Sequence, residues 1–201
     1  MSAARPRLPQ EFVVAHRRRR MIDAMAELCA EHGYAATRIA AVVERARVAR
    51  KSLYDNFAGK EGLLLAAFDA TVGDLEAVVV EACDAVAADD WNVRAEAGLR
   101  ALLDYVAAHP EATKLCLVEA PVATAASAER YEAAFESCVA RLCEVAPPGP
   151  DRSGVLEEAL VGGTVWIVQR QVRRGEGDRA SELLPQLAEF VVSPYRDVGK
   201  R

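Results

Sequence analysis

Apolar residues recur with the spacing of an α-helix along nearly the whole 201-residue chain. Ile22, Met25, Ala26 and Cys29 stand at positions i, i+3, i+4 and i+7, which places them on one face of a helix. The same stepping runs through residues 64–86, and no stretch alternates between apolar and polar residues as a half-buried strand does. The pattern therefore predicts an all-α protein of about nine helices.

Residues that start or stop helices divide this pattern. Gly33 follows the first stretch and is predicted as a left-handed stop, and Thr37 precedes the second stretch as its N-cap. Asp, Pro and Gly mark the later breaks. We expect later helices at about residues 93–108, 110–121, 123–145, 154–174 and 178–192.

Charge is distributed unevenly along the chain. Residues 1–60 hold 12 Lys and Arg against 6 Asp and Glu, a net charge of +6, whereas residues 61–201 carry −11. A basic end on an acidic body predicts a polyanionic partner for that end. The longest uncharged apolar run, residues 159–168, is too short to cross a membrane, and residues 1–12 lack the apolar core of a secretory signal. We therefore expect a cytoplasmic protein with no membrane partner.

The cysteines give no sign of a metal site or a disulfide framework. Their number is odd, and no pair has the C-x2-C spacing of metal ligands. We expect small buried apolar residues in a reducing compartment, with no cofactor and no metal. The five are Cys29, Cys83, Cys116, Cys138 and Cys143.

The most informative pattern is a pair of short helices joined by a tight turn. Residues 45–48 separate the second stretch from a third at about residues 49–57, which is the size of a helix-turn-helix. If Leu53 and Phe57 are buried, helical geometry leaves Arg50, Lys51 and Tyr54 on the open side. Such a helix can enter a major groove, where Arg and Lys pair with guanine. A surface hairpin with ordinary solvated charges is the alternative.

The same region resembles a known family. Gly33–Tyr34, the motif Leu53-Tyr54-x-x-Phe57 and Lys60–Glu61, within residues 17–68, are similar to the N-terminal domain of the tetracycline-repressor (TetR) family. The resemblance implies an all-α homodimer, most often a repressor. It would bind a palindromic operator in double-stranded DNA and release it when a small molecule binds. It also implies a helix-turn-helix domain with a basic arm in residues 1–60, and a ligand-binding and dimerisation domain in residues 61–201.

Site residues follow from the exposed face and from the resemblance together. Thr37 would cap the second helix near a phosphate, Tyr54 and Lys60 would hold phosphates, and the others would face bases or the sugar-phosphate backbone. The predicted DNA-binding residues are Thr37, Arg47, Arg50, Lys51, Ser52, Tyr54, Asn56 and Lys60.

The sequence departs from the family pattern at the turn. Arg47 stands where the family usually has Gly, which costs about 1 kcal/mol if its φ is positive. Ala49 replaces a hydroxyl N-cap, a loss of about 1 kcal/mol, and Gly59 replaces a Ser cap almost neutrally. These departures keep open a second interpretation, a sensor or interaction protein whose helix-turn-helix no longer binds DNA.

The acidic body is predicted to hold the dimer surface and a ligand cavity, and each of these residues could instead be plain core. Small and apolar residues on the last two long helices suit a symmetric four-helix interface. The interface candidates are Gly162, Gly163, Trp166, Gln169, Leu183, Leu187 and Phe190. The ligand candidates are Trp91, Leu103, Tyr105, Cys116, Glu119, Phe135 and Trp166, of which Glu119 could meet a cationic ligand or pair with an Arg.

An enzyme is the remaining alternative. His16, His32 and His109 have no sequence neighbours that suggest a catalytic triad or a metal site. The chain also lacks the G-x-S-x-G, P-loop and H-E-x-x-H motifs. We therefore expect no catalytic residues.

Overall fold

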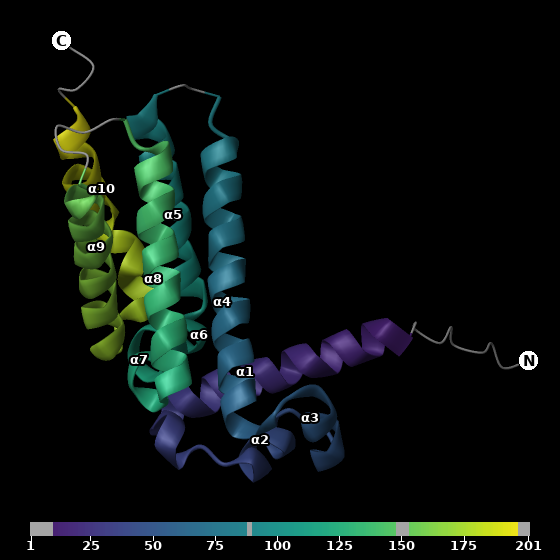
Figure 1. Cartoon of the computed structure of the whole chain (residues 1–201). Coiled ribbons are helices and arrows are strands. Elements are labelled where there is room, and N and C mark those ends of the chain that lie inside the picture. The colour runs from purple at the N-terminus through teal and green to yellow at the C-terminus, as the bar shows by residue number, and fades with distance from the viewer. Residues whose placement is uncertain (1–9, 88–89, 148–152, 197–201) are drawn as a thin grey trace, which may run out of the picture.

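The computed structural model describes residues 10–87, 90–147 and 153–196, and helices account for nearly all of them. The long helices α4 (Gly59–Asp84), α5 (Trp91–Ala108), α8 (Ala125–Val145), α9 (Val155–Arg173) and the shorter α10 (Leu184–Val192) stand side by side (Figure 1). Helices α1 (Gln10–Ala36), α2 (Ile39–Arg45) and α3 (Arg50–Asn56) lie at one end of this bundle. The predicted all-α fold is confirmed.

Short helices complete the chain. Helix α6 (Pro110–Lys114) continues into a π-helical turn, η1 (Leu115–Glu119), and then into α7 (Ala120–Ala123). Two 3-10 segments, η2 (Gly177–Leu183) and η3 (Ser193–Tyr195), flank α10. The bounds agree with the sequence-based expectations to within a few residues, apart from these interruptions.

Two of the predicted helix-end details are wrong. Gly33 has the expected positive φ of 79°, but its ψ of 158° is extended, so it kinks α1 instead of ending it in the left-handed conformation. Thr37 is not the N-cap of α2, because that position is Arg38 and has no side-chain cap bond. Thr37 is buried, and its hydroxyl donates to the carbonyl of Gly33 at 2.9 Å, which closes the turn after α1 instead.

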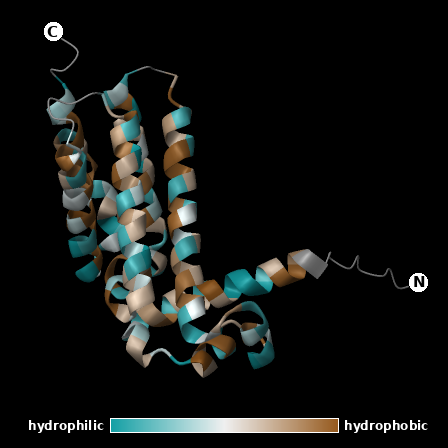
Figure 2. Cartoon of the chain, viewed as in Figure 1, coloured by the Kyte–Doolittle hydropathy of each residue, from teal (hydrophilic) through white to brown (hydrophobic). Residues whose placement is uncertain are grey.

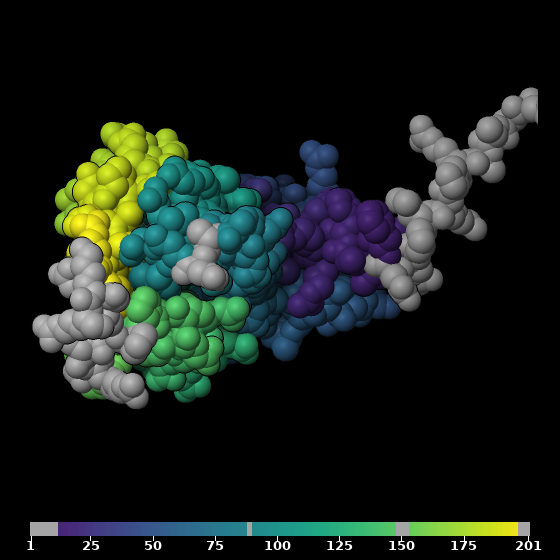
Figure 3. Space-filling view, turned by 90° about the horizontal axis from the view of Figure 1, so that it is seen from above, coloured from purple at the N-terminus to yellow at the C-terminus, as the bar shows by residue number. Residues whose placement is uncertain are grey.

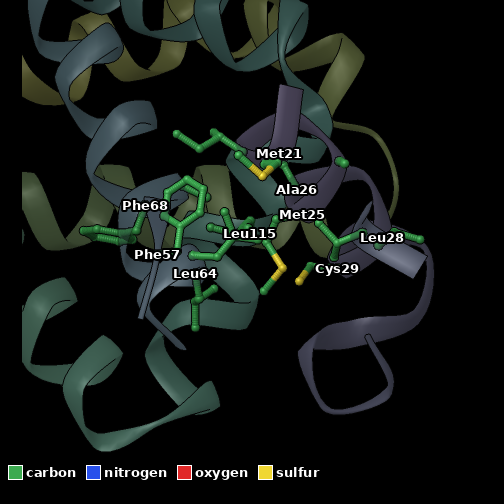
Figure 4. Close-up of a cluster of buried hydrophobic side chains, with 14 of the residues drawn as sticks. Met21, Met25, Ala26, Leu28, Cys29, Phe57, Leu64, Phe68 and Leu115 are labelled. Atoms are coloured by element: carbon green, nitrogen blue, oxygen red, sulfur yellow. The ribbon is translucent and has the colours of Figure 1, made fainter. Parts of the chain in front are cut away.

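A first apolar core joins the N-terminal helices to the bundle. Met21 and Met25 of α1 and Leu64 of α4 are fully buried there, and Leu115 and Cys116 of η1 complete it (Figure 4). Phe57 and Phe68 also belong to this cluster. Because α1 packs on α4 and on the α6–η1 segment, the end of α1 is held by parts of the chain far away in sequence. The division into two domains at residue 60 stays a prediction, since α4 begins at Gly59 and runs on without a break.

A second core lies inside the bundle, between α5, α9, η2 and α10. Leu103, Val168 and Leu187 are its most buried members. Hydrophobic and hydrophilic residues share each bundle helix (Figure 2), which is the pattern that one buried face requires. Seen from above, the first half of α1 projects beyond the bundle (Figure 3).

The cysteines differ from the prediction in part. Cys29 and Cys116 are buried as expected, whereas Cys138 and Cys143 are exposed on α8 and Cys83 is half-buried. Burial raises the pKa of Cys116 to about 12 and that of Cys29 to about 11. The residues that the structure describes hold no cluster of side chains suited to a metal ion, and no described helix is both long and apolar enough to span a membrane.

Candidate nucleic-acid interface

The turn between α2 and α3 has the backbone that the sequence anticipated. Arg47 has a φ of 51°, a left-handed conformation that glycine adopts more easily. Ala49 is the N-cap of α3 and forms no side-chain cap bond, so both departures from the family pattern carry their expected cost. The guanidinium of Arg20 compensates, because it donates to the carbonyl of Ala46 and, at 3.2 Å, to that of Arg47.

Two more arginines of the run at residues 17–20 have structural contacts. Arg18 donates to the carbonyl of Asn56 at 3.1 Å and stacks 4.5 Å above the ring of Phe57. Arg19 forms ion pairs with Asp23 at 2.9 Å and with Asp74 at 2.8 Å. This run therefore holds α1 against α3 and α4 through its side chains.

Helix α3 turns one face inward and the other outward, as its spacing predicts. Leu53 has no exposed surface, and it anchors the helix. Arg50, Lys51 and Tyr54 are exposed, and the Arg50 guanidinium lies 5.8 Å from the centre of the Tyr54 ring. The arrangement presents two cations and a phenol hydroxyl together on one outward face, which is the chemistry that phosphates and guanine edges bind.

The other predicted DNA-binding residues are less open. Ser52 and Asn56 are half-buried, and the Asn56 amide donates to the carbonyl of Ser52 at 2.7 Å. The ammonium of Lys60 donates to the carbonyl of Tyr34 at 2.5 Å and lies 4.0 Å from the centre of that ring. Lys60 thus contacts the end of α1, where carbonyls lack helical partners and a cation is favourable.

Two further side chains hold the same end of α1. The Lys114 ammonium donates to the carbonyl of Ala30 at 2.6 Å. The Glu119 carboxylate accepts the N–H of Tyr34 at 2.7 Å, directly after the kink at Gly33. Glu119 therefore fixes the position of α1 relative to η1, and its partner in the structure is this backbone N–H, not an Arg.

The ligand candidates are not brought together in one cavity. Leu103, Tyr105 and Cys116 are buried in the packed interior, where burial raises the pKa of Tyr105 to about 12. Trp91 packs edge-on against Tyr195 with ring centroids 5.5 Å apart, away from the first core. Only Phe135 and Trp166 line a common space.

That space is an open groove of about 680 Å³ between α8 and α9. Its aromatic side chains are Tyr131, Phe135 and Trp166, its carboxylates are Glu132, Glu136 and Glu158, and Gln169 lies in its wall. The sequence reasoning missed Tyr131 and the three glutamates. Their spacing of four residues on α8, with Tyr131 before Phe135 and Glu132 before Glu136, is a signal that could have found them.

The interface candidates divide into interior and surface. Gln169 and Leu187 are buried within the chain, so their assignment to a dimer surface is wrong; the Gln169 amide donates to the carbonyl of Leu117 in the π-helical turn. Trp166 and Phe190 remain exposed, at 58% and 39%. A Cβ on Gly163 would lie 2.9 Å from the ring of Phe190, so this glycine lets α9 and α10 approach closely. Gly162 lines the groove, and Leu183 is half-buried beside the second core.

The model of the bacterial regulatory proteins of the tetR family matches residues 21–67, the segment that forms this interface. The N-terminal part of this chain belongs to the TetR family. By family, the protein is a DNA-binding transcriptional regulator with a helix-turn-helix. A comparison with curated proteins gave no match.

Solved structures share the TetR-type fold over almost the whole chain. The fatty acid degradation regulator FadR from Bacillus halodurans is 16% identical with a TM-score of 0.79, covering 96% of this chain and 99% of that one. FadR from Bacillus subtilis in complex with stearoyl-CoA is 18% identical with a TM-score of 0.75, covering 88% and 98%. A TetR-like regulator from Rhodococcus is 20% identical with a TM-score of 0.69, covering 93% and 99%. At these identities the likeness concerns the fold alone.

Proposed function

We propose that this TetR-family protein is a ligand-responsive regulator, most simply a repressor, that binds a palindromic operator as a homodimer. The observation that carries the proposal is the outer face of α3, where Arg50, Lys51 and Tyr54 are exposed on a helix anchored by Leu53. One helix of this size fits a B-DNA major groove, and a dimer reads half-sites about 34–36 Å apart.

The proposed contacts follow from exposure. Arg50 and Lys51 would reach base edges or phosphates, Tyr54 would donate to a phosphate, and Arg47 would add a cation beside the turn. Ser52 and Asn56 would contribute from the flank of α3. Thr37 and Lys60 would act on DNA indirectly, because both side chains already bond to the backbone at the end of α1.

The proposed dimer surface is the exposed apolar part of α9 and α10. Trp166 and Phe190 are large, exposed and close to Gly163, which suits close packing of four helices around a two-fold axis. The other half of the proposal is release of DNA when a small molecule binds the body. A coupling of about 1–3 kcal/mol would weaken operator binding about 5–150-fold. We place the protein in the cytoplasm and assign it no catalytic step.

Fluorescence anisotropy with duplexes from its own upstream DNA tests this proposal. Arg50→Ala and Lys51→Ala should weaken binding and each lower the salt slope, because a lost phosphate contact reduces it by about 0.9. Arg174→Ala removes an exposed cation from the far end of α9 and should leave binding unchanged. A stable monomer, or a protein that ignores every duplex at low salt, refutes the proposal and favours the sensor with a degenerate helix-turn-helix, for which the uncapped α3 argues.

A further inference from the structure

We propose that the groove between α8 and α9 is a binding site for an aromatic organic cation. The inference rests on the proposed ligand response and names its site and the class of its ligand. The argument has three parts: the aromatic walls, the surrounding charges, and the contact between the groove and the end of α1.

Aromatic side chains from both helices form the walls. Helices α8 and α9 are neighbours that run in opposite directions (Figure 1), with Phe135 opposite Gly162. A Cβ on Gly162 would lie 3.7 Å from the Phe135 ring, so the absence of a side chain there keeps the groove open. Trp166 follows one turn later on α9 and is 58% exposed, while Tyr131 precedes Phe135 on α8. A flat apolar ligand can stack between these rings.

The charges in the groove are negative. Glu136 on α8 and Glu158 on α9 lie toward one end, and Glu132 lies nearer the aromatic end. None of the three has an ion pair within the described ranges 10–87, 90–147 and 153–196. The nearest identified cation is Arg173, whose charge acts on Tyr131 at the other end. Carboxylates beside aromatic faces favour a cation, since both attract positive charge.

The same carboxylates disfavour an anionic ligand. The structurally similar FadR from Bacillus subtilis was solved with stearoyl-CoA, whose headgroup carries several phosphates. A phosphate in this groove would face three glutamates, so like-charge repulsion opposes its binding. The groove therefore selects against that class, while the net charge of −11 over residues 61–201 attracts cations to the body as a whole.

Gln169 connects the groove to the reading head. Its side chain lines the groove, and its amide donates to the carbonyl of Leu117 within the π-helical turn. Two residues later, Glu119 accepts the N–H of Tyr34 at the end of α1. A ligand that draws the Gln169 amide away leaves the Leu117 carbonyl unpaired. The π-helical turn then loses support exactly where it positions Glu119.

The binding test uses the full chain with Trp91→Phe, which leaves Trp166 as the only tryptophan of two. Titration with tetraphenylphosphonium should quench Trp166 emission saturably. Its isosteric anion tetraphenylborate, and stearoyl-CoA, should bind at least about tenfold more weakly. Glu136→Gln combined with Glu158→Gln should raise the dissociation constant for the cation about five- to tenfold. Glu129→Gln, on an exposed part of α8 outside the groove, should not change it.

The outcomes separate this site from the proposed function. Equal binding of cation and anion, preference for stearoyl-CoA, or no binding overturns the site, while DNA binding measured without any probe tests the regulator independently. A Trp166 signal that changes only on dilution would mean that a second copy fills the groove, and this also overturns the site. Gln169→Leu should still bind the cation but lose at least about fivefold of its effect on DNA affinity; an unchanged effect refutes the coupling.

Discussion

Lys60 offers the sharpest distinction between the role implied by resemblance and the role given by tertiary contacts. Resemblance makes it a phosphate ligand, whereas its ammonium donates to the carbonyl of Tyr34 at 2.5 Å and lies 3.4 Å from that of Ala35. We predict that Lys60 positions α1 and contributes no phosphate contact. Lys60→Met tests this, because methionine keeps an apolar chain against the Tyr34 ring and removes only the charge and its donors.

The expected magnitude follows from the contacts that are lost. A hydrogen bond from a charged donor contributes about 1.5–3 kcal/mol, and water access to this half-buried site favours the lower end. The cation–π contact, 4.0 Å from ammonium to ring centre, adds about 0.5–1 kcal/mol, and water recovers part of the loss at the freed carbonyls. We expect a net loss of about 1–2 kcal/mol, which lowers the melting temperature of a 201-residue chain by about 2–6 °C.

Thermal unfolding and anisotropy at several salt concentrations measure both roles together. Lys60→Met should melt earlier and bind operator more weakly, with an unchanged slope of log affinity against log salt. Lys51→Met is the matched control: it removes an exposed lysine, so it should lower the slope by about 0.9 and leave the melting temperature alone. If Lys60→Met melts like the parent and loses about 0.9 of slope, Lys60 is a phosphate ligand and the positioning argument fails.

Three other perturbations have defined outcomes. Arg47→Gly should raise stability by about 0.5–1 kcal/mol in thermal unfolding, because it relieves the φ of 51°; an unchanged melting temperature would contradict this strain. Tyr195→Phe should cost about 1–3 kcal/mol, since the buried Glu157 carboxylate loses a donor at 2.8 Å, and denaturant unfolding would show no loss if that bond were unimportant. Native Cys116 should resist maleimide while Cys143 reacts. Because burial raises the pKa of the Cys116 thiol from 9.0 to about 12, its contribution to stability is complete below pH 9 and lost as pH rises toward 12; a flat unfolding free energy over that range would contradict this.

The sequence by itself determined the helices and the two faces of α3. A period of 3.6 residues puts Leu53 inside and Arg50 and Tyr54 outside whatever the helix packs against, and the structure agrees at each of these positions. The positive φ at Arg47 could also be anticipated, since a turn of four residues between two helices leaves few backbone conformations. These features are local, so nearby residues are enough to encode them.

Only the tertiary structure decided which side chains meet. Glu119 reaches the backbone of Tyr34 across 85 positions of sequence, and the groove pairs Phe135 with residues more than 20 positions away. Lys60 was expected to face DNA and instead bonds to α1. Periodicity gives the face of a helix but neither its neighbour nor its rotation against that neighbour, because both are set by how all the buried surfaces pack at once.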